Sequence, residues 1–197
     1  AFLTQVAELQ QPEDLLDELK HHAAGNSVLL DVNQAPYALT LAVEEAKGTV
    51  VKGRDPVTLP RAIKNDTEIA GARAAHIRDG AAVSSFLAWL NSQEPGQIDE
   101  ISAAKKLEET RAQMAGAHPL RDISFDTISG SGPNGAIIHY RVTTDTNRNL
   151  GEGELYLCDS GGQYEDGTTD ITRTLPVGEP TSEMRRKFTL VLKGMIA

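Results

Sequence analysis

The sequence contains a single cysteine, no long apolar run and no excess of basic residues. Cys158 is the one cysteine among 197 residues, which excludes an intramolecular disulfide framework and is typical of a reducing compartment. The absence of a run of about 18 apolar residues argues against a membrane-spanning helix. The formal net charge of -9 argues against nucleic acid as a partner. We therefore expect a cytoplasmic protein that binds neither nucleic acid nor membrane.

The composition is nevertheless that of a folded protein. Hydrophobic residues make up 40% of the chain and charged residues 24%, which allows a buried core. The first residues resemble neither a signal peptide nor an initiating methionine, and the last seven, VLKGMIA, form an apolar stretch in the middle of a pattern. We therefore expect the chain to be an internal fragment of a longer protein.

Helical and strand patterns alternate in the first part of the chain. Residues 12–20 and 37–46 have helical apolar spacing, whereas residues 27–32 and 49–51 are short apolar runs typical of buried strands. Such alternation favours a parallel α/β arrangement. We predict that residues 1–58 are the end of a small α/β domain, with a boundary near the proline-containing segment that follows the second strand.

Two helices are predicted next. Asn65 and Glu68 have the spacing of a capping box, which indicates the start of a long helix. His76 falls on the apolar stripe of this helix, and we interpret it as a structural residue. Residues 100–114 show the apolar spacing of a second helix.

Extended patterns dominate from residue 123 onward. A turn sequence, GSGPNG, separates the first two predicted strands, and a loop at residues 161–167 separates the last two. A final helix is expected after a cap at Thr181 or Ser182, so the chain as a whole is predicted to be α+β. The predicted strands are residues 123–128, 136–142, 155–160 and 168–177.

Asp159 and Asp170 are the most informative residues of the sequence. Asp159 ends an apolar strand and Asp170 lies in a threonine-rich strand, where aspartate is disfavoured. Pairing of the two strands as a hairpin can place them directly opposite each other, with Cβ atoms about 4.5–5.5 Å apart. Two carboxylates so close repel each other unless a cation lies between them, and two-metal sites hold their ions about 3.5–4 Å apart.

The neighbouring residues allow simpler interpretations. The two aspartates could only cap a turn and face solvent, and that alternative stays open on the residue pattern alone. Glu165 and Asp166 are interpreted as solvated turn residues. Cys158 alternates to the face opposite the aspartates, where we expect it to fill the core beside Ile171 rather than bind metal.

His139 interrupts the apolar segment Ile137–Tyr140, which we assign to a strand. The residue pattern by itself favours a buried histidine that is satisfied by a backbone carbonyl.

A family resemblance extends over most of the chain. The string from Asp159 to Thr174, DSGGQYEDGTTDITRT, resembles the metal-ligand hairpin of the Xaa-Pro aminopeptidases (aminopeptidase P) of the pita-bread metallopeptidase superfamily. The strings KNDTEIAGARAAHIRDGAA, DEISAAKKLEE and SGPNGAIIHYR support the same family. The resemblance covers residues 59–197, the expected first half of a pita-bread catalytic domain. Residues 1–58 resemble the end of the creatinase-like domain that precedes it.

The resemblance implies a role for each candidate residue. Asp159 would chelate one metal ion and Asp170 would bridge two, the expected ions being Mn²⁺, which suits carboxylate ligands. A hydroxide between the ions would be the nucleophile. His139 would contact the substrate and support the transition state, rather than bind metal.

The resemblance also implies an activity, which is removal of the N-terminal residue from peptides with proline in second position. The full-length protein would be a homodimer, and its remaining metal ligands, a histidine and two glutamates, would lie beyond Ala197. The fragment alone is therefore expected to be inactive. Two alternatives remain, a proline dipeptidase and a pita-bread relative that has lost catalysis and acts as a binding protein.

Overall fold

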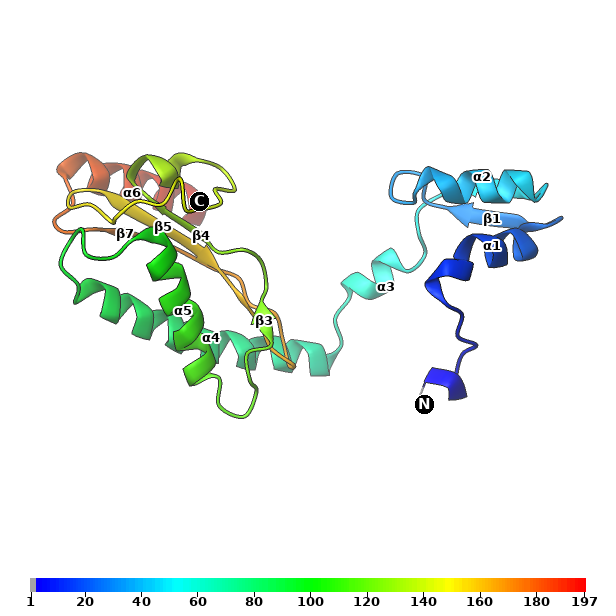
Figure 1. Cartoon of the computed structure of the whole chain (residues 1–197), viewed down its shortest axis with the longest axis horizontal. Coiled ribbons are helices and arrows are strands. Elements are labelled where there is room, and N and C mark those ends of the chain that lie inside the picture. Colours follow the sequence, from blue (N-terminus) through cyan, green and yellow to red (C-terminus); the bar gives the residue numbers. More distant parts are fainter. Residues whose placement is uncertain (1–2) are drawn as a thin grey trace. The chain divides into compact units, whose positions relative to one another are not determined.

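The computed structural model describes residues 3–197, which divide into two compact units. One unit ends at Lys64 and the next begins at Asn65, a few residues after the boundary that the sequence predicts. Figure 1 shows both units, with most of their helices and strands labelled. No helix within residues 3–197 is long and apolar enough to cross a membrane.

The first unit is a small α/β unit. Its two strands pair in parallel, with Val28 opposite Val50, as the alternating patterns predict. Ala23, Leu30 and Val43 form its buried core. The elements are two 3-10 helices at Leu3–Gln5 and Pro12–Asp14, helices α1 (Leu15–Ala23), α2 (Tyr37–Glu45) and α3 (Thr58–Ala62), and strands β1 (Ser27–Leu30) and β2 (Thr49–Lys52).

Two helices open the second unit, α4 (Asp66–Asn91) and α5 (Glu100–Met114). The predicted capping box is present, because the Asn65 side chain accepts a hydrogen bond from the Glu68 amide and the Glu68 carboxylate accepts one from the Asn65 amide. Asp99 caps α5 through one bond, which its side chain accepts from the Ser102 amide. Both predicted helices are therefore confirmed.

After these helices comes a three-stranded antiparallel sheet in the order β4-β5-β7, and β3 and β6 pair as a separate two-stranded sheet. The bounds are β3 (Asp122–Ile123), β4 (Ile128–Ser131), β5 (Leu155–Ser160), β6 (Gly162–Gln163), β7 (Ile171–Pro176) and the last helix α6 (Ser182–Ile196). Thr181 caps α6, as predicted. The predicted strand 123–128 is not continuous: Ile123 pairs with Gly162 in β3–β6, and Ile128 pairs with Asp159 in β4–β5.

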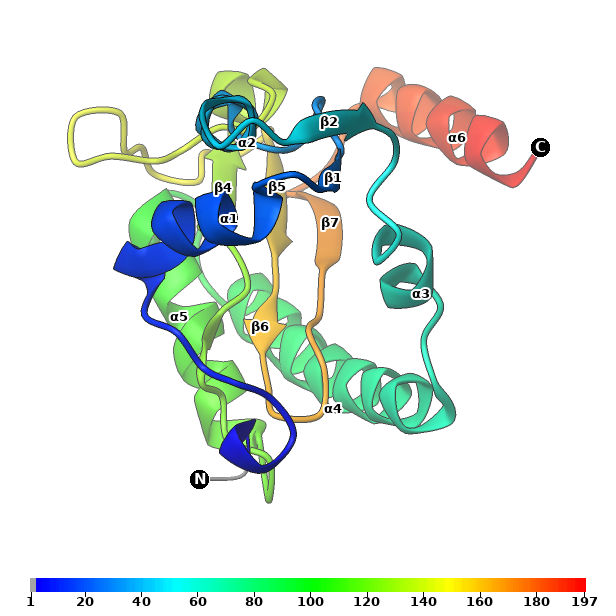
Figure 2. The same ribbon diagram turned by 90° about the vertical axis from the view of Figure 1, so that its right-hand side faces the viewer.

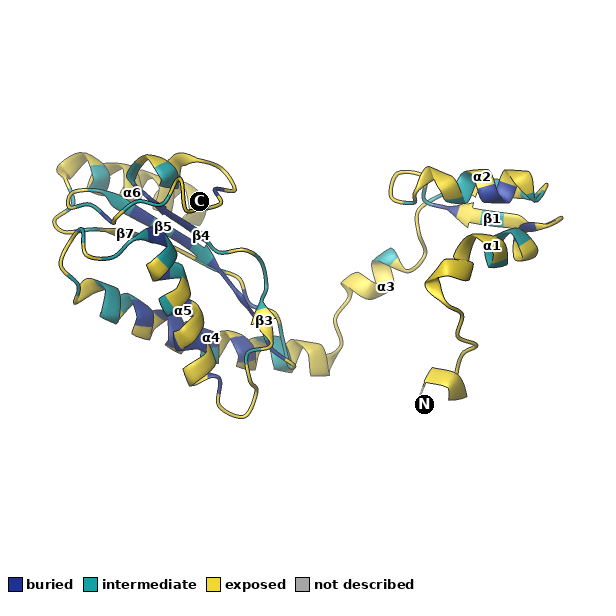
Figure 3. Cartoon of the chain, in the orientation of Figure 1, coloured by how far each residue is buried: buried dark blue, intermediate teal, exposed yellow. Residues whose placement is uncertain are grey.

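The core of this unit lies between the sheet and the two helices. Tyr156 and Cys158 of β5 are buried together with Phe86 of α4 and Leu107 of α5. Figure 3 shows the buried residues along β5 and the facing side of α4. Ile171 packs against this cluster, so the predicted core position of Cys158 beside it is confirmed. Burial raises the pKa of the Cys158 thiol, which keeps it protonated.

The predicted strand 136–142 is wrong. A short 3-10 helix, Gly132–Ala136, is followed by a turn instead, and His139 has a positive φ of 54° there. The reason is tertiary. The Asn134 amide donates to the buried carboxylate of Glu100 at 3.0 and 3.1 Å, and the Tyr140 hydroxyl donates to the same carboxylate at 3.1 Å. These anchors hold the segment as a loop over the start of α5.

Candidate metal centre

The hairpin that carries the two candidate ligands is formed by β5, β6 and β7. Its observed register differs by two residues from the predicted one, because Asp159 lies opposite Thr172 and Ser160 opposite Ile171. Asp170 directly precedes β7. The prediction that Asp159 and Asp170 are directly opposed is therefore wrong.

The same-side prediction for these aspartates is confirmed. A shift of two residues preserves the face, since side chains alternate with a period of two along a strand. Asp170 thus lies diagonally across from Asp159, a separation that side chains can span. Desolvation raises the pKa of Asp170, and the charge of Asp159 and a hydrogen bond to it raise that pKa further. The two carboxylates therefore interact, while the Thr172 hydroxyl donates to Asp159 Oδ1 at 2.7 Å.

The anchoring of the hairpin tip to α4 explains the register. Tyr164 is buried, and its hydroxyl donates to Asp79 of α4 at 3.1 Å. Its backbone amide bonds to the Gly167 carbonyl at 3.0 Å, which places the tip at the two residues between them. Gly71 of α4 touches the backbone of the tip so closely that a Cβ there would collide with it. In Figure 2, β6 and the tip of the hairpin lie in front of α4.

The interpretation of Asp166 as a solvated residue is wrong. The guanidinium of Arg78, on α4, donates to its two carboxylate oxygens at 2.9 and 2.6 Å, and this pairing lowers the pKa of Asp166. Arg78 also lies over the Tyr164 ring, 5.2 Å from its centroid. Glu165, by contrast, is exposed and pairs with Arg121 at the surface.

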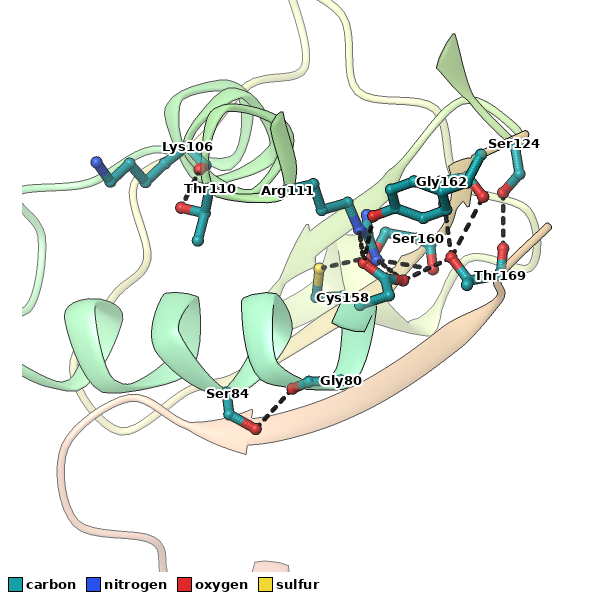
Figure 4. Close-up of polar contacts among 12 residues, drawn as sticks. Gly80, Ser84, Lys106, Thr110, Arg111, Ser124, Cys158, Ser160, Gly162 and Thr169 are labelled. Atoms are coloured by element: carbon teal, nitrogen blue, oxygen red, sulfur yellow. Dashed lines mark hydrogen bonds and ion pairs between the residues drawn. The ribbon is translucent and has the colours of Figure 1, made fainter. Parts of the chain in front are cut away.

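A buried ion pair lies behind the aspartates, on the helix-covered face of the hairpin. Arg111 Nε donates to Asp79 Oδ1 at 2.6 Å, and the side chains are 1% and 0% exposed. Thr169 Oγ1 donates to Asp79 Oδ2 at 2.5 Å, and Arg111 Nη2 reaches the Ser160 carbonyl at 3.4 Å. Figure 4 shows Arg111, Ser160 and Thr169 converging in this network. Desolvation, followed by the charge of Asp79, raises the pKa of Tyr164 to about 12, so its hydroxyl keeps its proton.

The histidines lie differently from their predicted positions. His139 is exposed in its turn, not buried in a strand, and within residues 3–197 no hydrogen bond or ion pair joins it to either aspartate. His76 is also exposed, not part of the core, and its Nδ1 lies 2.8 Å from the Ala72 carbonyl. A positive charge on His76 lowers the pKa of Asp170, which places this histidine near the carboxylate pair. The sequence placed His76 on the apolar stripe of this helix, and that pattern gave no indication that it lies near the aspartates.

The donor set fits a hard divalent cation in part. Two interacting carboxylates on one face are candidate oxygen ligands. Desolvation raises the pKa of Asp170 first and the charge of Asp159 raises it further, a repulsion that a cation would relieve. Within residues 3–197, however, no group of three or more histidine, cysteine, aspartate or glutamate side chains could hold a metal ion. The described residues therefore supply two candidate ligands, fewer than a metal ion needs.

The two units and the paired aspartates have the organisation of a metallopeptidase. Residues 70–197 match the model of metallopeptidase family M24, and residues 1–68 match that of the creatinase/prolidase N-terminal domain. The chain belongs to metallopeptidase family M24. The predicted fold class, the end of a creatinase-like α/β domain followed by the first part of a pita-bread metallopeptidase domain, is confirmed.

The chain is similar to several longer proteins. It is 46% identical over 187 residues to a probable Xaa-Pro aminopeptidase P of Aspergillus flavus, covering 92% of this chain and 28% of the relative. A crystal structure of X-prolyl aminopeptidase from Caenorhabditis elegans, titled a cytosolic enzyme with a di-nuclear active site, superposes with a TM-score of 0.75 at 26% identity, covering 92% of this chain and 30% of that one. An Xaa-Pro dipeptidase from Bacillus anthracis gives 0.75 at 25% identity, covering 95% and 51%.

Proposed function

We propose that this chain is part of a dinuclear metal-dependent aminopeptidase, which removes the N-terminal residue from peptides with proline in second position. The observation that supports it most is the pair of interacting carboxylates, Asp159 and Asp170, on one face of a hairpin in an M24 chain. The chain spans only 28% of the length of the aminopeptidase P relative from Aspergillus flavus. The activity therefore belongs to a full-length protein that contains this chain.

In this proposal Asp159 would hold one ion and Asp170 would be a ligand shared by both. Mn²⁺ is the proposed metal, because carboxylates favour hard cations. When bound, such cations polarise the scissile carbonyl and bring the pKa of a water molecule towards neutrality. The Thr172 hydroxyl fixes the orientation of Asp159 through its 2.7 Å hydrogen bond.

His139 is proposed to contact the substrate near the scissile carbonyl and to support the transition state. The next residue, Tyr140, donates a hydrogen bond from its hydroxyl to the buried Glu100. This bond holds one end of the turn that carries His139. Its exposed side chain is available to a peptide. We further propose that the full-length protein is a cytoplasmic homodimer, the cytosolic location being that of the Caenorhabditis elegans relative.

The test is peptide cleavage by the full-length protein. After removal of metal by a chelator, added Mn²⁺ should restore release of the first residue from a Xaa-Pro-Yaa tripeptide. Asp159→Asn should reduce turnover by more than about 100-fold, beyond the typical effect of losing a group that only supports a ligand. Asp145→Asn, a change at an exposed loop aspartate, is the matched control and should leave turnover unchanged.

The same assay separates the alternatives. A proline dipeptidase is suggested by the similarity to the Bacillus anthracis enzyme. Cleavage of the dipeptide Xaa-Pro without cleavage of the tripeptide would establish that activity and contradict our proposal. Peptide binding without any cleavage, with or without Mn²⁺, would instead indicate a binding protein that has lost catalysis.

A further inference from the structure

The residues next to the two aspartates are held from the opposite face of the hairpin. Ser160 follows Asp159, and Thr169 precedes Asp170; both neighbours are buried, at 1% and 0% exposure. Because side chains alternate along a strand, each neighbour points towards the helices when its aspartate points away from them. Any group that fixes these neighbours therefore also fixes the backbone from which the carboxylates project.

Thr169 is fixed by several bonds at once. Its hydroxyl donates to Asp79 at 2.5 Å and accepts from the Gly162 amide at 2.9 Å. Its amide donates to the Gly162 carbonyl at 2.9 Å, and its carbonyl accepts from the Ser124 hydroxyl at 2.9 Å. Figure 4 shows the bonds around Thr169, Gly162 and Ser124. One buried side chain thus joins both arms of the hairpin to α4.

Asp79 and Arg111 are the two charged groups at the centre of these bonds. Asp79 accepts from the Tyr164 hydroxyl, from Thr169 and from Arg111, so its carboxylate binds both ends of the segment that links the arms. Arg111 extends the contact to the Ser160 carbonyl at 3.4 Å. A buried ion pair is weak evidence for stability in general, because desolvation offsets much of its attraction. A role in geometry explains its position better.

We infer that Asp79 and Arg111 are positioning residues for the metal pair, acting through Thr169 and Ser160 to set the spacing of Asp159 and Asp170. This inference rests on the proposed function. Two-metal sites require a narrow range of distances between their ions, so a bridging carboxylate must project from a rigid backbone. Asp79 and Arg111 are proposed to act through the backbone of the hairpin and not by touching the metals or the substrate.

The test uses Thr169, because removing either member of the buried pair would leave the other charged and unpaired. Thr169→Val keeps the shape and removes the hydroxyl, whereas Thr169→Ser keeps the hydroxyl. Thr110→Val is the matched control, because Thr110 is also buried but donates only to the Lys106 carbonyl within α5. Tyr164→Phe removes the other hydroxyl that donates to Asp79. It replaces Thr169→Val in the test if that variant does not fold.

Two properties of the full-length protein are measured. The first is amide hydrogen exchange of residues 159–171 without metal, which Thr169→Val should accelerate and Thr169→Ser and Thr110→Val should not. The second is Mn²⁺ affinity by calorimetric titration, which Thr169→Val should lower by about 10–100-fold, as is typical for groups that support metal ligands. Thr169→Ser should restore it.

The outcomes are distinct. Unchanged exchange, or faster exchange with unchanged Mn²⁺ affinity, would overturn the inference, because the hydroxyl would then be merely structural or irrelevant to the ligands. An equal loss of Mn²⁺ affinity in Thr110→Val would also overturn it. If the unmodified protein binds no Mn²⁺, the proposed function fails and this inference fails with it, whereas loss of affinity confined to Thr169→Val and Tyr164→Phe supports both.

Discussion

Asp159 lies across from Thr172 in the β5–β7 ladder and accepts a 2.7 Å hydrogen bond from its hydroxyl. Asp170 is therefore a diagonal neighbour of Asp159, and the two carboxylates share a face without being directly opposed. This arrangement leaves one oxygen of Asp159 held by a neutral donor while the carboxylate still interacts with Asp170. A cation between them would replace their repulsion with attraction.

Asp170→Asn should stabilise the metal-free protein at neutral pH. The pKa of Asp170 is raised in the folded state, so its contribution to stability is full below the unfolded pKa and is lost as pH rises through the folded pKa. Asparagine carries no charge, so the variant does not lose this stability as pH rises. Its melting temperature at pH 7 should rise by only about 1–2 °C, because Asp170 is exposed and solvent screens its interaction with the half-buried Asp159. The difference should vanish below about pH 4.

Added Mn²⁺ should reverse the order of the melting temperatures of Asp170→Asn and the unmodified protein. The metal stabilises the folded protein that binds it, in proportion to the logarithm of metal concentration over the dissociation constant. The unmodified full-length protein should therefore become more heat-stable than Asp170→Asn when Mn²⁺ is present. An equal stabilisation of both proteins would show that Asp170 is not a ligand.

His139→Ala in the full-length protein should lower kcat by about 10²–10³, the usual cost of losing one donor to the transition state. Metal content and Mn²⁺ affinity should stay unchanged, because among the described residues no hydrogen bond or ion pair joins His139 to either aspartate. Steady-state kinetics together with metal analysis separate the two effects. Normal turnover with depleted metal would mark His139 as a ligand instead.

The 197-residue chain alone should be catalytically silent on Xaa-Pro peptides, even with added Mn²⁺. Two aspartates supply at most four carboxylate oxygens, and within residues 3–197 no larger ligand group exists. Helix α6 buries none of its residues, and Val191 and Met195 are each 75% exposed, so the chain is also expected to self-associate. The measurement compares first-residue release by this chain and by the full-length protein. Comparable turnover would show that the chain holds a complete site.

Glu100→Ala should destabilise the second unit by about 3 kcal/mol. The buried carboxylate accepts from the Ser131 amide, the Asn134 side chain and the Tyr140 hydroxyl, so the variant removes an acceptor that these three donors share. Glu109→Ala, at an exposed position of the same helix, should change stability by less than about 0.5 kcal/mol. Urea unfolding measures both, and equal effects would contradict the role of Glu100.

Local patterns predicted much of the second unit. The Asn65 and Glu68 capping box, the helix at 100–114 and the strand at 155–160 were each predicted from patterns of residues close in the chain, and each is present. The shared face of Asp159 and Asp170 also followed, because the period of two holds in either register. The roles of these two residues and of His139 stay predictions.

The sequence by itself determined the family, through a string of ligand-hairpin residues, and the alternation that puts both aspartates on one side. Only the tertiary structure decided the hairpin register and the loop at residues 132–142. Tyr164 and Asp166 are pulled towards α4 by partners about 80 residues or more away in the chain, and Asn134 is held by Glu100. Local spacing carries no information about such distant partners, so the anchors that place these loops emerge only when the chain is folded.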